Sequence, residues 1–457
     1  MEAERLLWLA ALAAFPSAVI GSYALGVRGE RLLRLSIACS SLLTAVTAVP
    51  LAAEFCLRNF VWQGCHPLSA VLVPFAALLW LLSVAVTPSG RLDEAGLARN
   101  AAACLLQMAA FLTISSAALI AIWIASALLF AFSHQEPRFT RARRLILSHL
   151  GLSSALLIAG VALMKYCRGH VGLEQWGVAL ILLAVILRQG IFPFHAWIPE
   201  IFEHGRIGPA VRFQAPQIGM YVALVLAVPH AHPALLRAVA ILAVVTAVYG
   251  ALLALHQADA RRACGYLFIS QSALVVAGLD LSSPSALAGA LILWVASGIA
   301  LAGLSRAVLA LEARRGRLRL DMYHGGYERM PRVAASFLVM CLAIANFPGT
   351  LGFIGGEMLV RGAVEVFPLL GLFAVAAAAF NGLAAMRMYF SLFCGKRGAG
   401  PHLAMRRWEG IGFAAAAVFL LGFGLMPRTF VRILGRASAA VVDPQKRLRI
   451  IKGSRAW

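Results

Sequence analysis

The chain has 457 residues, of which 61% are hydrophobic and only 13% are charged. A soluble globular protein carries about 25% charged residues and roughly 45–50% apolar ones, so this composition excludes a soluble globular fold, a disordered chain and a disulfide scaffold. It predicts a protein that lies in lipid. Lys and Arg number 40 against 19 Asp and Glu, a net charge of +21. In a membrane protein this excess indicates orientation by basic loops, and nucleic-acid binding is the weaker interpretation.

Apolar runs long enough to cross a bilayer follow one another along the whole chain. A crossing needs about 20 apolar residues, and the loops between the runs are too short for a soluble domain. The first run lacks the basic start of a cleaved signal peptide, so we expect it to be a retained span. We expect about fourteen transmembrane helices, near residues 5–26, 32–53, 68–87, 97–114, 116–134, 143–165, 174–194, 208–229, 234–256, 262–280, 284–311, 331–350, 366–394 and 409–427.

Basic residues gather in alternate loops. They follow the first, fifth, eleventh and thirteenth spans, for example in HQEPRFTRARR (134–144) and EARRGRLRLDMYHGGYERMPR (312–332), whereas the loops after even spans are nearly neutral. The positive-inside rule then predicts cytoplasmic odd loops, an outward N-terminus and a location in the cell inner membrane. The basic C-terminal tail conflicts with this orientation, so either one more short crossing lies within 428–442 or the number of spans differs by one.

The sequence contains no motif for a cofactor, a metal ion or a catalytic centre. There is no phosphate-binding loop, dinucleotide fingerprint, HExxH or CxxC, and we expect no cofactor and no catalytic residue in this chain. Cys56 and Cys65 share a short loop predicted to lie outside the cell. A disulfide between them and two free thiols both remain open.

Two stretches interrupt the apolar pattern with proline and glycine. The first is 187–221, with prolines at 193, 199, 209 and 216, and the second is 346–368. Broken helices at membrane depth persist only where they are buried in protein or line a watery cavity. A pair of them indicates inverted repeats around an ion or substrate path, and re-entrant loops without a transport role are the alternative.

Charged residues within the apolar runs are candidates for function, because each costs roughly 2.5–3.5 kcal/mol to insert. Arg188 is the strongest candidate, since it follows more than ten apolar residues and precedes a proline break. Arg387 is close enough to a helix end to snorkel instead, and Glu357 either pairs with Arg361 or lines a polar path. The remaining candidates lie at the ends of spans: Glu200, His256, Asp259 and Arg261.

Four blocks in this order resemble the antiporter-like membrane subunits of respiratory complex I. They are FPFHAWIPEIFEHG (192–205), HQADARRACGYLFISQSALVVAGL (256–279), FPGTLGFIGGEML (347–359) and MRMYFSLFCG (386–395). That family is related to multisubunit cation/proton antiporters, membrane hydrogenases and the membrane partner of inorganic-carbon pumps. The resemblance covers roughly residues 115–395. It implies an all-α polytopic fold with about fourteen helices and two inverted repeats with broken helices.

The resemblance also implies a row of Lys, Glu and His at mid-membrane that carries protons, and this sequence departs from it. The family lysine falls on Arg188, and its usual glutamate partner, which follows a tryptophan, falls on Ile124. The next titratable positions fall near Gln217 and on Ser297, and His195 is the motif histidine. Arginine barely deprotonates, so the scaffold is present while much of the proton path is not.

We therefore predict a membrane subunit of a complex I-like or related ion-translocating complex. It either takes part in proton translocation or supports it with a partly degenerate channel. The alternatives are a membrane subunit of an energy-coupled inorganic-carbon uptake pump and a non-conducting structural subunit. The expected partners are other membrane subunits and the bilayer, and the chain is at most a non-catalytic part of an oxidoreductase. The predicted organisation is N-terminal helices (1–95), a first repeat (96–256), a second repeat (257–395) and a C-terminal helix with a basic tail (396–457).

Overall fold

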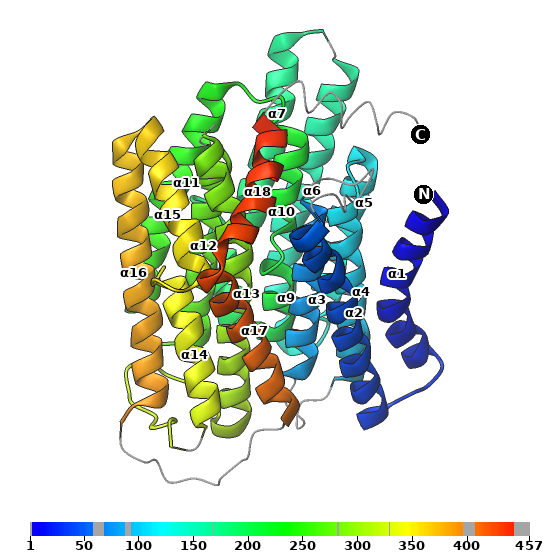
Figure 1. Ribbon diagram of the computed structural model, residues 1–457, viewed down its shortest axis with the longest axis vertical. Helices are drawn as coiled ribbons and strands as arrows, with labels where there is room; N and C mark the ends of the chain where they lie inside the picture. Colours follow the sequence, from blue (N-terminus) through cyan, green and yellow to red (C-terminus); the bar gives the residue numbers. More distant parts are fainter. Residues whose placement is uncertain are drawn as a thin grey trace.

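The computed structural model describes residues 2–57, 68–86, 93–167, 169–280, 283–328, 330–395 and 407–442. In these ranges the chain forms helices and no β-strand, and the long helices run side by side (Figure 1). The first helices are α1 (Glu2–Ala24), α2 (Gly29–Leu57), α3 (Ser69–Ala85), α4 (Glu94–Leu112), α5 (Ser116–Phe132), the 3-10 turn η2 (Pro137–Phe139), α6 (Thr140–Tyr166), α7 (Val171–Gln189), α8 (Trp197–His204), α9 (Ile207–Gln214), α10 (Ile218–Val222) and the π-helical turn η3 (Ala223–Ala227).

The second part of the chain continues the same bundle. It contains α11 (Pro233–His256), α12 (Ala260–Asp280), α13 (Pro284–Arg315), α14 (Pro331–Ile344), α15 (Leu351–Val366), α16 (Pro368–Phe393), α17 (Arg407–Leu425) and α18 (Pro427–Val442). Among the described residues, ten helical segments are long and apolar enough to cross a membrane, and four apolar helices are shorter. The expected all-α polytopic membrane fold is confirmed, and the number of crossings stays a prediction.

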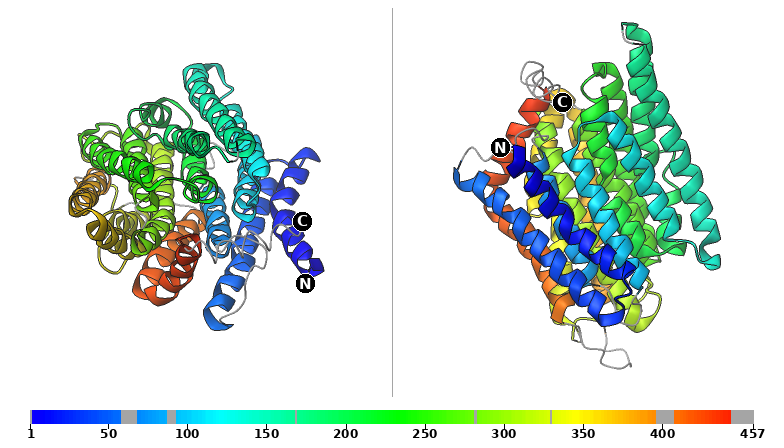
Figure 2. Two further views of the ribbon diagram at one scale, coloured as in Figure 1. Left: turned by 90° about the horizontal axis from the view of Figure 1, so that it is seen from above. Right: turned by 90° about the vertical axis from the view of Figure 1, so that its right-hand side faces the viewer.

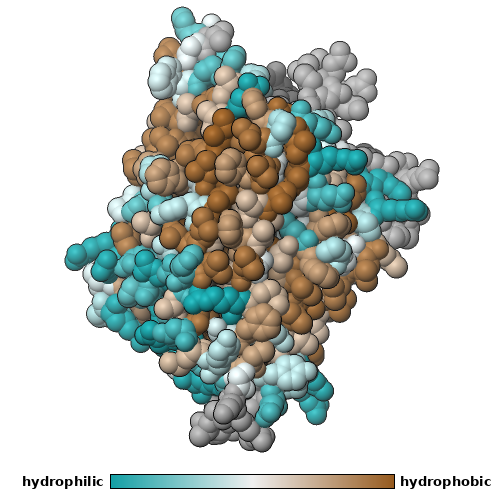
Figure 3. Space-filling view, turned by 90° about the vertical axis from the view of Figure 1, so that its left-hand side faces the viewer, coloured by the Kyte–Doolittle hydropathy of each residue, from teal (hydrophilic) through white to brown (hydrophobic). Residues whose placement is uncertain are grey.

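The bundle is organised around α13, whose apolar stretch is buried along its whole length. It packs against α3, α12, α14 and α15, and the other helices surround this group (Figure 2). On the outside, large apolar side chains are exposed on α11 and α16, for example Val245, Leu372 and Leu383. Figure 3 shows a broad hydrophobic area on the side that α16 covers, between hydrophilic ends. Such a surface is stable in lipid rather than in water.

The first proline-rich stretch breaks a helix between α7 and α8. Gly190 follows α7 with a φ of +68°, and a Cβ at this position would collide with Cδ1 of Ile198, so only glycine fits. The indole N–H of Trp197 donates to the carbonyl oxygen of Leu187 at 3.1 Å. This bond adds to the long one, at 3.4 Å, that the N–H of Gly190 makes to the same carbonyl at the end of α7. The motif tryptophan therefore caps the break and holds the last turn of α7 in place.

The second interruption separates α14 from α15. Asn346 adopts a φ of +53°, and the hydroxyl of Thr350 accepts the N–H of Phe353 at 3.3 Å to cap the new helix. Gly352 packs against the carbonyl of Ala343 so closely that a Cβ would overlap it. Both predicted breaks are therefore present in the structure. The inverted relation between the two halves and the predicted domain boundaries stay predictions.

The C-terminal segment does not fit one of the two explanations for the basic tail, a further short crossing within 428–442. Pro427 opens α18 directly after α17, and α18 continues away from α17 along α13 rather than turning back (Figure 1). Proline ends the hydrogen-bonding of one helix but is well suited to the first turn of the next. Residues 428–442 thus form no separate return crossing. Cys65 and the side chain of Cys56 lie outside the described residues, so their pairing stays open.

Candidate functional site

Arg188 lies in the last turn of α7 and is closed in by aromatic rings. Its guanidinium carbon is 4.2 Å from the centre of the Trp123 ring and 4.4 Å from that of Phe213. The guanidinium donates to the hydroxyl of Ser126 at 2.8 Å and to the carbonyl oxygen of Trp123 at 3.4 Å. Only 2% of the residue is exposed. The cation is therefore held between two π faces and fixed by hydrogen bonds to α5.

No acidic side chain forms an ion pair with Arg188 in the described part of the chain. Ile124, next to Trp123 on α5, occupies the position at which the resemblance places a glutamate. A buried charge without a counter-ion is stable only when hydrogen bonds and polarisable groups replace its hydration. The two rings and the two acceptors of α5 supply this replacement. The result is a permanent positive charge with no neighbouring group to exchange a proton with.

Besides Arg188, several glutamine side chains are buried in the interior. Gln189, Gln214, Gln217 and Gln271 are each less than 4% exposed. Each has at least one amide atom without a hydrogen-bond partner in the described structure. Buried polar atoms are almost always satisfied, and water can satisfy such atoms where the site has room for it. None of these amides can carry a proton as an ion.

The second half of the chain has a similar neutral arrangement. The amide nitrogen of Asn381 on α16 donates to the hydroxyl of Ser270 on α12 at 2.8 Å. Gln271 donates to the carbonyl of Ile344 at the end of α14, at 3.4 Å. The hydroxyl of Ser297 donates to its own helix, at the carbonyl of Trp294, and no titratable group takes part in these contacts. The contacts near the second break are thus between neutral groups, whereas the first break holds the buried charge of Arg188.

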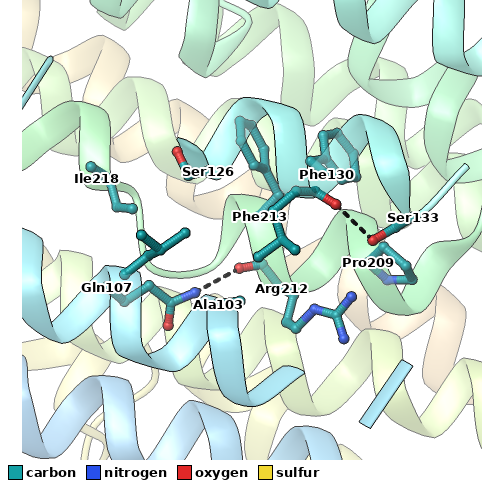
Figure 4. A pocket seen from close by; sticks show the side chains of 11 residues that line it. Ala103, Gln107, Ser126, Phe130, Ser133, Pro209, Arg212, Phe213 and Ile218 are labelled. Carbon is teal, nitrogen blue, oxygen red and sulfur yellow. Dashed lines mark hydrogen bonds between the residues drawn. The ribbon is translucent and has the colours of Figure 1, made fainter. Parts of the chain in front are cut away.

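A small pocket is lined by Ser126 and Phe213, two residues that contact Arg188. It has a volume of about 30 Å³ and lies between α4, α5 and α9. In Figure 4, Gln107 and Arg212 lie on one side of it and Ser126 on another, and Gln107 donates to the carbonyl of Arg212 at 3.2 Å. Arg212 also lines a much larger cavity of about 900 Å³. Arg212 thus lines both spaces, and Ser126, which lines the small pocket, is the hydroxyl that Arg188 contacts.

We call the larger space the arginine cavity, because seven arginines and three acidic residues line it. At its rim, Asp93 accepts the N–H of Gly96 at the start of α4 and pairs with Arg99 and Arg206, at 2.7 Å each. Burial raises the pKa of Asp93, but the Gly96 hydrogen bond and the two arginines outweigh it, so the pKa lies below its usual value. Asp93 is therefore ionised and ties α4 to the loop before α9.

His134 joins α5 to the same loop. Its Nε2 accepts the backbone N–H of Arg206 at 3.1 Å, and its Nδ1 lies 3.1 Å from the carbonyl oxygen of Phe130. This pattern requires the neutral ring with its proton on Nδ1. Burial, together with the charges of Arg206 and Arg212, lowers the pKa of His134 to about 4. His134 is neutral at physiological pH and positions the start of α9.

Several residues predicted for a proton path lie instead at the ends of helices, in ion pairs. Asp259 accepts from Arg317 at 2.6 Å, and Arg261 donates to Glu312 at 2.7 Å. His256 is exposed at the end of α11. These pairs hold the start of α12 against the end of α13. They give the charges a structural explanation, and a role in proton transfer stays a prediction.

The remaining predicted residues are scattered. Arg387 donates to the carbonyl oxygens of Leu255 and Gln257 and so caps the end of α11, while Glu200 pairs with Arg141 at 3.1 Å. Glu357 is exposed on α15, and no ion pair with Arg361 forms between these two described residues. His195 is half-buried beside Tyr249, with ring centres 5.1 Å apart. None of them shares the contacts of Arg188.

Sequence reasoning did not single out the contacts of Arg188 or the other interior arginines. Ser126 and Phe213 have no sequence signal, because only folding brings α5 and α9 to α7. Arg306, by contrast, follows an apolar run within α13 just as Arg188 does within α7. The same signal, an arginine embedded in an apolar helix, could have identified it.

Comparison with known proteins agrees with the resemblance that the four sequence blocks indicate. The family model described as NADH:quinone oxidoreductase/Mrp antiporter, TM, matches residues 118–381. The chain is 28% identical over 257 residues to NADH-quinone oxidoreductase subunit 13 of Thermus thermophilus, covering 55% of this chain and 54% of that protein. It is 29% identical to NADH-quinone oxidoreductase subunit N of Chromohalobacter salexigens, covering 64% of each. The chain thus spans between about half and two thirds of the length of these curated relatives.

Solved structures share the fold. A chain of respiratory complex I from Thermus thermophilus superposes with a TM-score of 0.82 at 21% identity, covering 95% of this chain and 99% of that one. A chain of the Mrp complex from Dietzia sp. superposes with a TM-score of 0.83 at 18% identity, covering 97% and 99%. At these identities the likeness concerns the fold alone. Because the family model covers more than half of the sequence, the chain belongs to the NADH:quinone oxidoreductase/Mrp antiporter transmembrane family.

Proposed function

We propose that this chain is a membrane subunit of a complex I-like or Mrp-related ion-translocating complex, and that its own channel does not relay protons through Arg188. The environment of Arg188 carries this proposal. A proton relay needs a group that gains and loses a proton near neutral pH. Arg188 is closed between Trp123 and Phe213 and has no acidic neighbour among the described residues, so it stays charged.

The amide interior supports the same function. Gln214 and Gln217 can orient water by donating and accepting hydrogen bonds, but amides do not ionise in the range in which proteins work. A fixed positive charge within the bundle repels a proton that approaches as a cation. The chain then serves the complex as scaffold. We further propose that it lies in the inner membrane with its N-terminus outside, and that it holds no cofactor.

The first test introduces the lysine and glutamate that the family resemblance places at positions 188 and 124. Purified chain, reconstituted in proteoliposomes with a pH-sensitive dye inside, is compared with the double variant Ile124→Glu/Arg188→Lys. A lysine beside a glutamate can titrate, so we expect flux near background in the natural chain and measurable flux in the variant. The matched control is Ile124→Gln/Arg188→Lys, which has similar size but no carboxylate. Flux in the natural chain that Arg188→Leu abolishes would overturn the proposal.

The second test identifies the complex. The chain is purified from its native membrane in a mild detergent, and the co-purifying proteins are identified by mass spectrometry. Subunits of a quinone reductase, a hydrogenase or a cation antiporter support the proposal. A large soluble zinc protein as the main partner would favour the inorganic-carbon pump instead. Purification of the chain alone, with no stoichiometric partner, would contradict membership of a complex.

A further inference from the structure

The arginine cavity is more positive than its own ion pairs can balance. It lies where α4 and α9 begin and where α5 and α13 end, and seven arginines face three acidic residues in its lining. Five of the seven arginines have a carboxylate partner within 4 Å: Arg99 and Arg206 share Asp93, Arg138 pairs with Glu136, Arg261 with Glu312 and Arg317 with Asp259. Arg212 and Arg306 have none among the described residues.

Arg306 is the deeper of the two. It is 3% exposed, although it sits in the lining of a cavity of about 900 Å³. Its guanidinium donates to the hydroxyl of Ser83 at 3.0 Å and to the carbonyl of Gly208 at 3.3 Å, while its Nε has no partner in the described structure. Neutral oxygens orient this cation but leave its charge uncompensated. A buried cation in this position favours an anion in the adjoining space.

Arg212 lines the same cavity as Arg306. It is one helical turn after Gly208 and therefore on the same face of α9 that Arg306 contacts. Among the described residues, the guanidinium of Arg212 donates to the carbonyl of Gly96, at a long distance of 3.4 Å. Two uncompensated like charges in the lining of one cavity raise the free energy of the empty cavity, and an anion there lowers it.

The start of α9 adds hydrogen-bond donors to the same wall. α9 begins at Ile207 with no side chain capping it, and the N–H of the preceding Arg206 is already bound to His134. The N–H groups in the first turn of a helix have no acceptor within the helix, and they attract anions. In α9 these donors are the N–H groups of Ile207 and Gly208, because Pro209 has no N–H and the N–H of Ala210 is bound to the carbonyl of Arg206. Gly208 lines the cavity without a side chain of its own, so the backbone there is accessible to a ligand.

We propose that the arginine cavity binds a phosphate group, held by Arg212, Arg306 and the first turn of α9. Two planar guanidinium groups and backbone N–H groups offer several donors around one centre, which suits an oxyanion with several acceptor oxygens better than a spherical halide. The volume exceeds that of a bare ion, so the cavity also has room for the groups that a phosphate carries. The phosphate can come from an anionic lipid headgroup or from free phosphate.

The test uses the full chain in neutral detergent, with inorganic phosphate as the probe. Thermal unfolding is followed while phosphate is raised at constant ionic strength with chloride as the balancing anion. We expect phosphate to raise the midpoint temperature of the natural chain. Arg306→Gln and Arg212→Gln should each weaken the apparent affinity about tenfold, since one charge-assisted contact is lost. Arg361→Gln, exposed on α15 and outside the lining of the cavity, is the matched control and should bind normally.

A second arm distinguishes the sources. The chain is placed in nanodiscs of phosphatidylcholine with or without phosphatidylglycerol, and retained lipid is measured by native mass spectrometry. Retained phosphatidylglycerol that Arg306→Gln releases identifies a lipid headgroup, whereas binding of inorganic phosphate alone identifies the free anion. Arg306→Lys keeps the charge and shows whether a loss in the Gln variant reflects misfolding. Equal stabilisation by chloride, or unchanged binding in both Gln variants, would overturn the proposal.

Discussion

Arg188 and Arg306 occupy similar positions within apolar helices but have different surroundings. Each is an arginine in an apolar helix, is at most 3% exposed, donates to a serine hydroxyl and a backbone carbonyl, and lacks a carboxylate partner among the described residues. Arg188 is enclosed by Trp123 and Phe213, whereas Arg306 borders a large cavity. The same residue type therefore forms a closed, fixed charge in one place and an open anion site in the other.

The largest expected effect tests the aromatic enclosure. Trp123→Ala removes a fully buried ring and one π face from Arg188, so we expect it to lower the free energy of unfolding by about 3–5 kcal/mol. The measurement is reversible unfolding in mixed micelles. Trp176 is 68% exposed on α7, and Trp176→Ala should change stability by no more than about 0.5 kcal/mol. Similar losses in both variants would show that the enclosure is not what stabilises the charge.

We expect the stability of the chain to depend on pH through His134, which holds the loop beside the arginine cavity. The pKa of His134 is lowered to about 4, so the folded chain keeps this ring neutral while the unfolded chain protonates it below about 6.5. The unfolded state then binds more protons, and stability is full above pH 6.5 and falls as the pH drops towards 4. Between pH 6.5 and 5 the loss should be roughly 2 kcal/mol. His134→Asn should remove this part of the slope, and an unchanged slope would contradict the assignment.

Replacing each arginine by lysine separates the two sites further. Lysine cannot stack its charge flat against two rings, so Arg188→Lys should lower the free energy of unfolding by about 1–2 kcal/mol. Added phosphate should not restore this stability. Arg306→Lys keeps a cation beside the cavity, so added phosphate should recover most of its loss. Thermal unfolding with and without phosphate measures both. Recovery of the Arg188 variant by phosphate would show that its site is open after all.

The smallest effect concerns the rim of the cavity. Asp93→Asn keeps the cap on α4 but removes the charge that Arg99 and Arg206 share, and we expect a loss of about 0.5–1 kcal/mol. Because the pKa of Asp93 is lowered, its contribution is present above about pH 4 and is lost below that value. Removing this carboxylate also leaves Arg99 without a carboxylate partner, while Arg206 keeps Glu136 at 3.7 Å, so phosphate should bind more tightly to Asp93→Asn. Weaker binding would contradict the charge argument.

Much of the fold could be predicted from the sequence because its causes are local. Apolar runs predict spans, and proline with glycine predicted both breaks, since backbone sterics act within a few residues. The contacts of the predicted polar residues could not be predicted in the same way. Arg387 and Asp259 are charged residues near apolar runs, but helix capping and ion pairs account for their contacts. Whether a charge serves structure or transport depends on neighbours that lie far away in the sequence.

The sequence alone determined that this protein lies in a membrane, where its helices break, to which family it is similar and which titratable positions it lacks. These properties depend on composition and short motifs. Only the tertiary structure decided that Arg188 is enclosed by Trp123 and Phe213, and that Arg212 and Arg306 meet at one cavity. The physical reason is that the state of a buried charge is set by the groups within a few ångströms of it, and here helices distant in the sequence supply those groups.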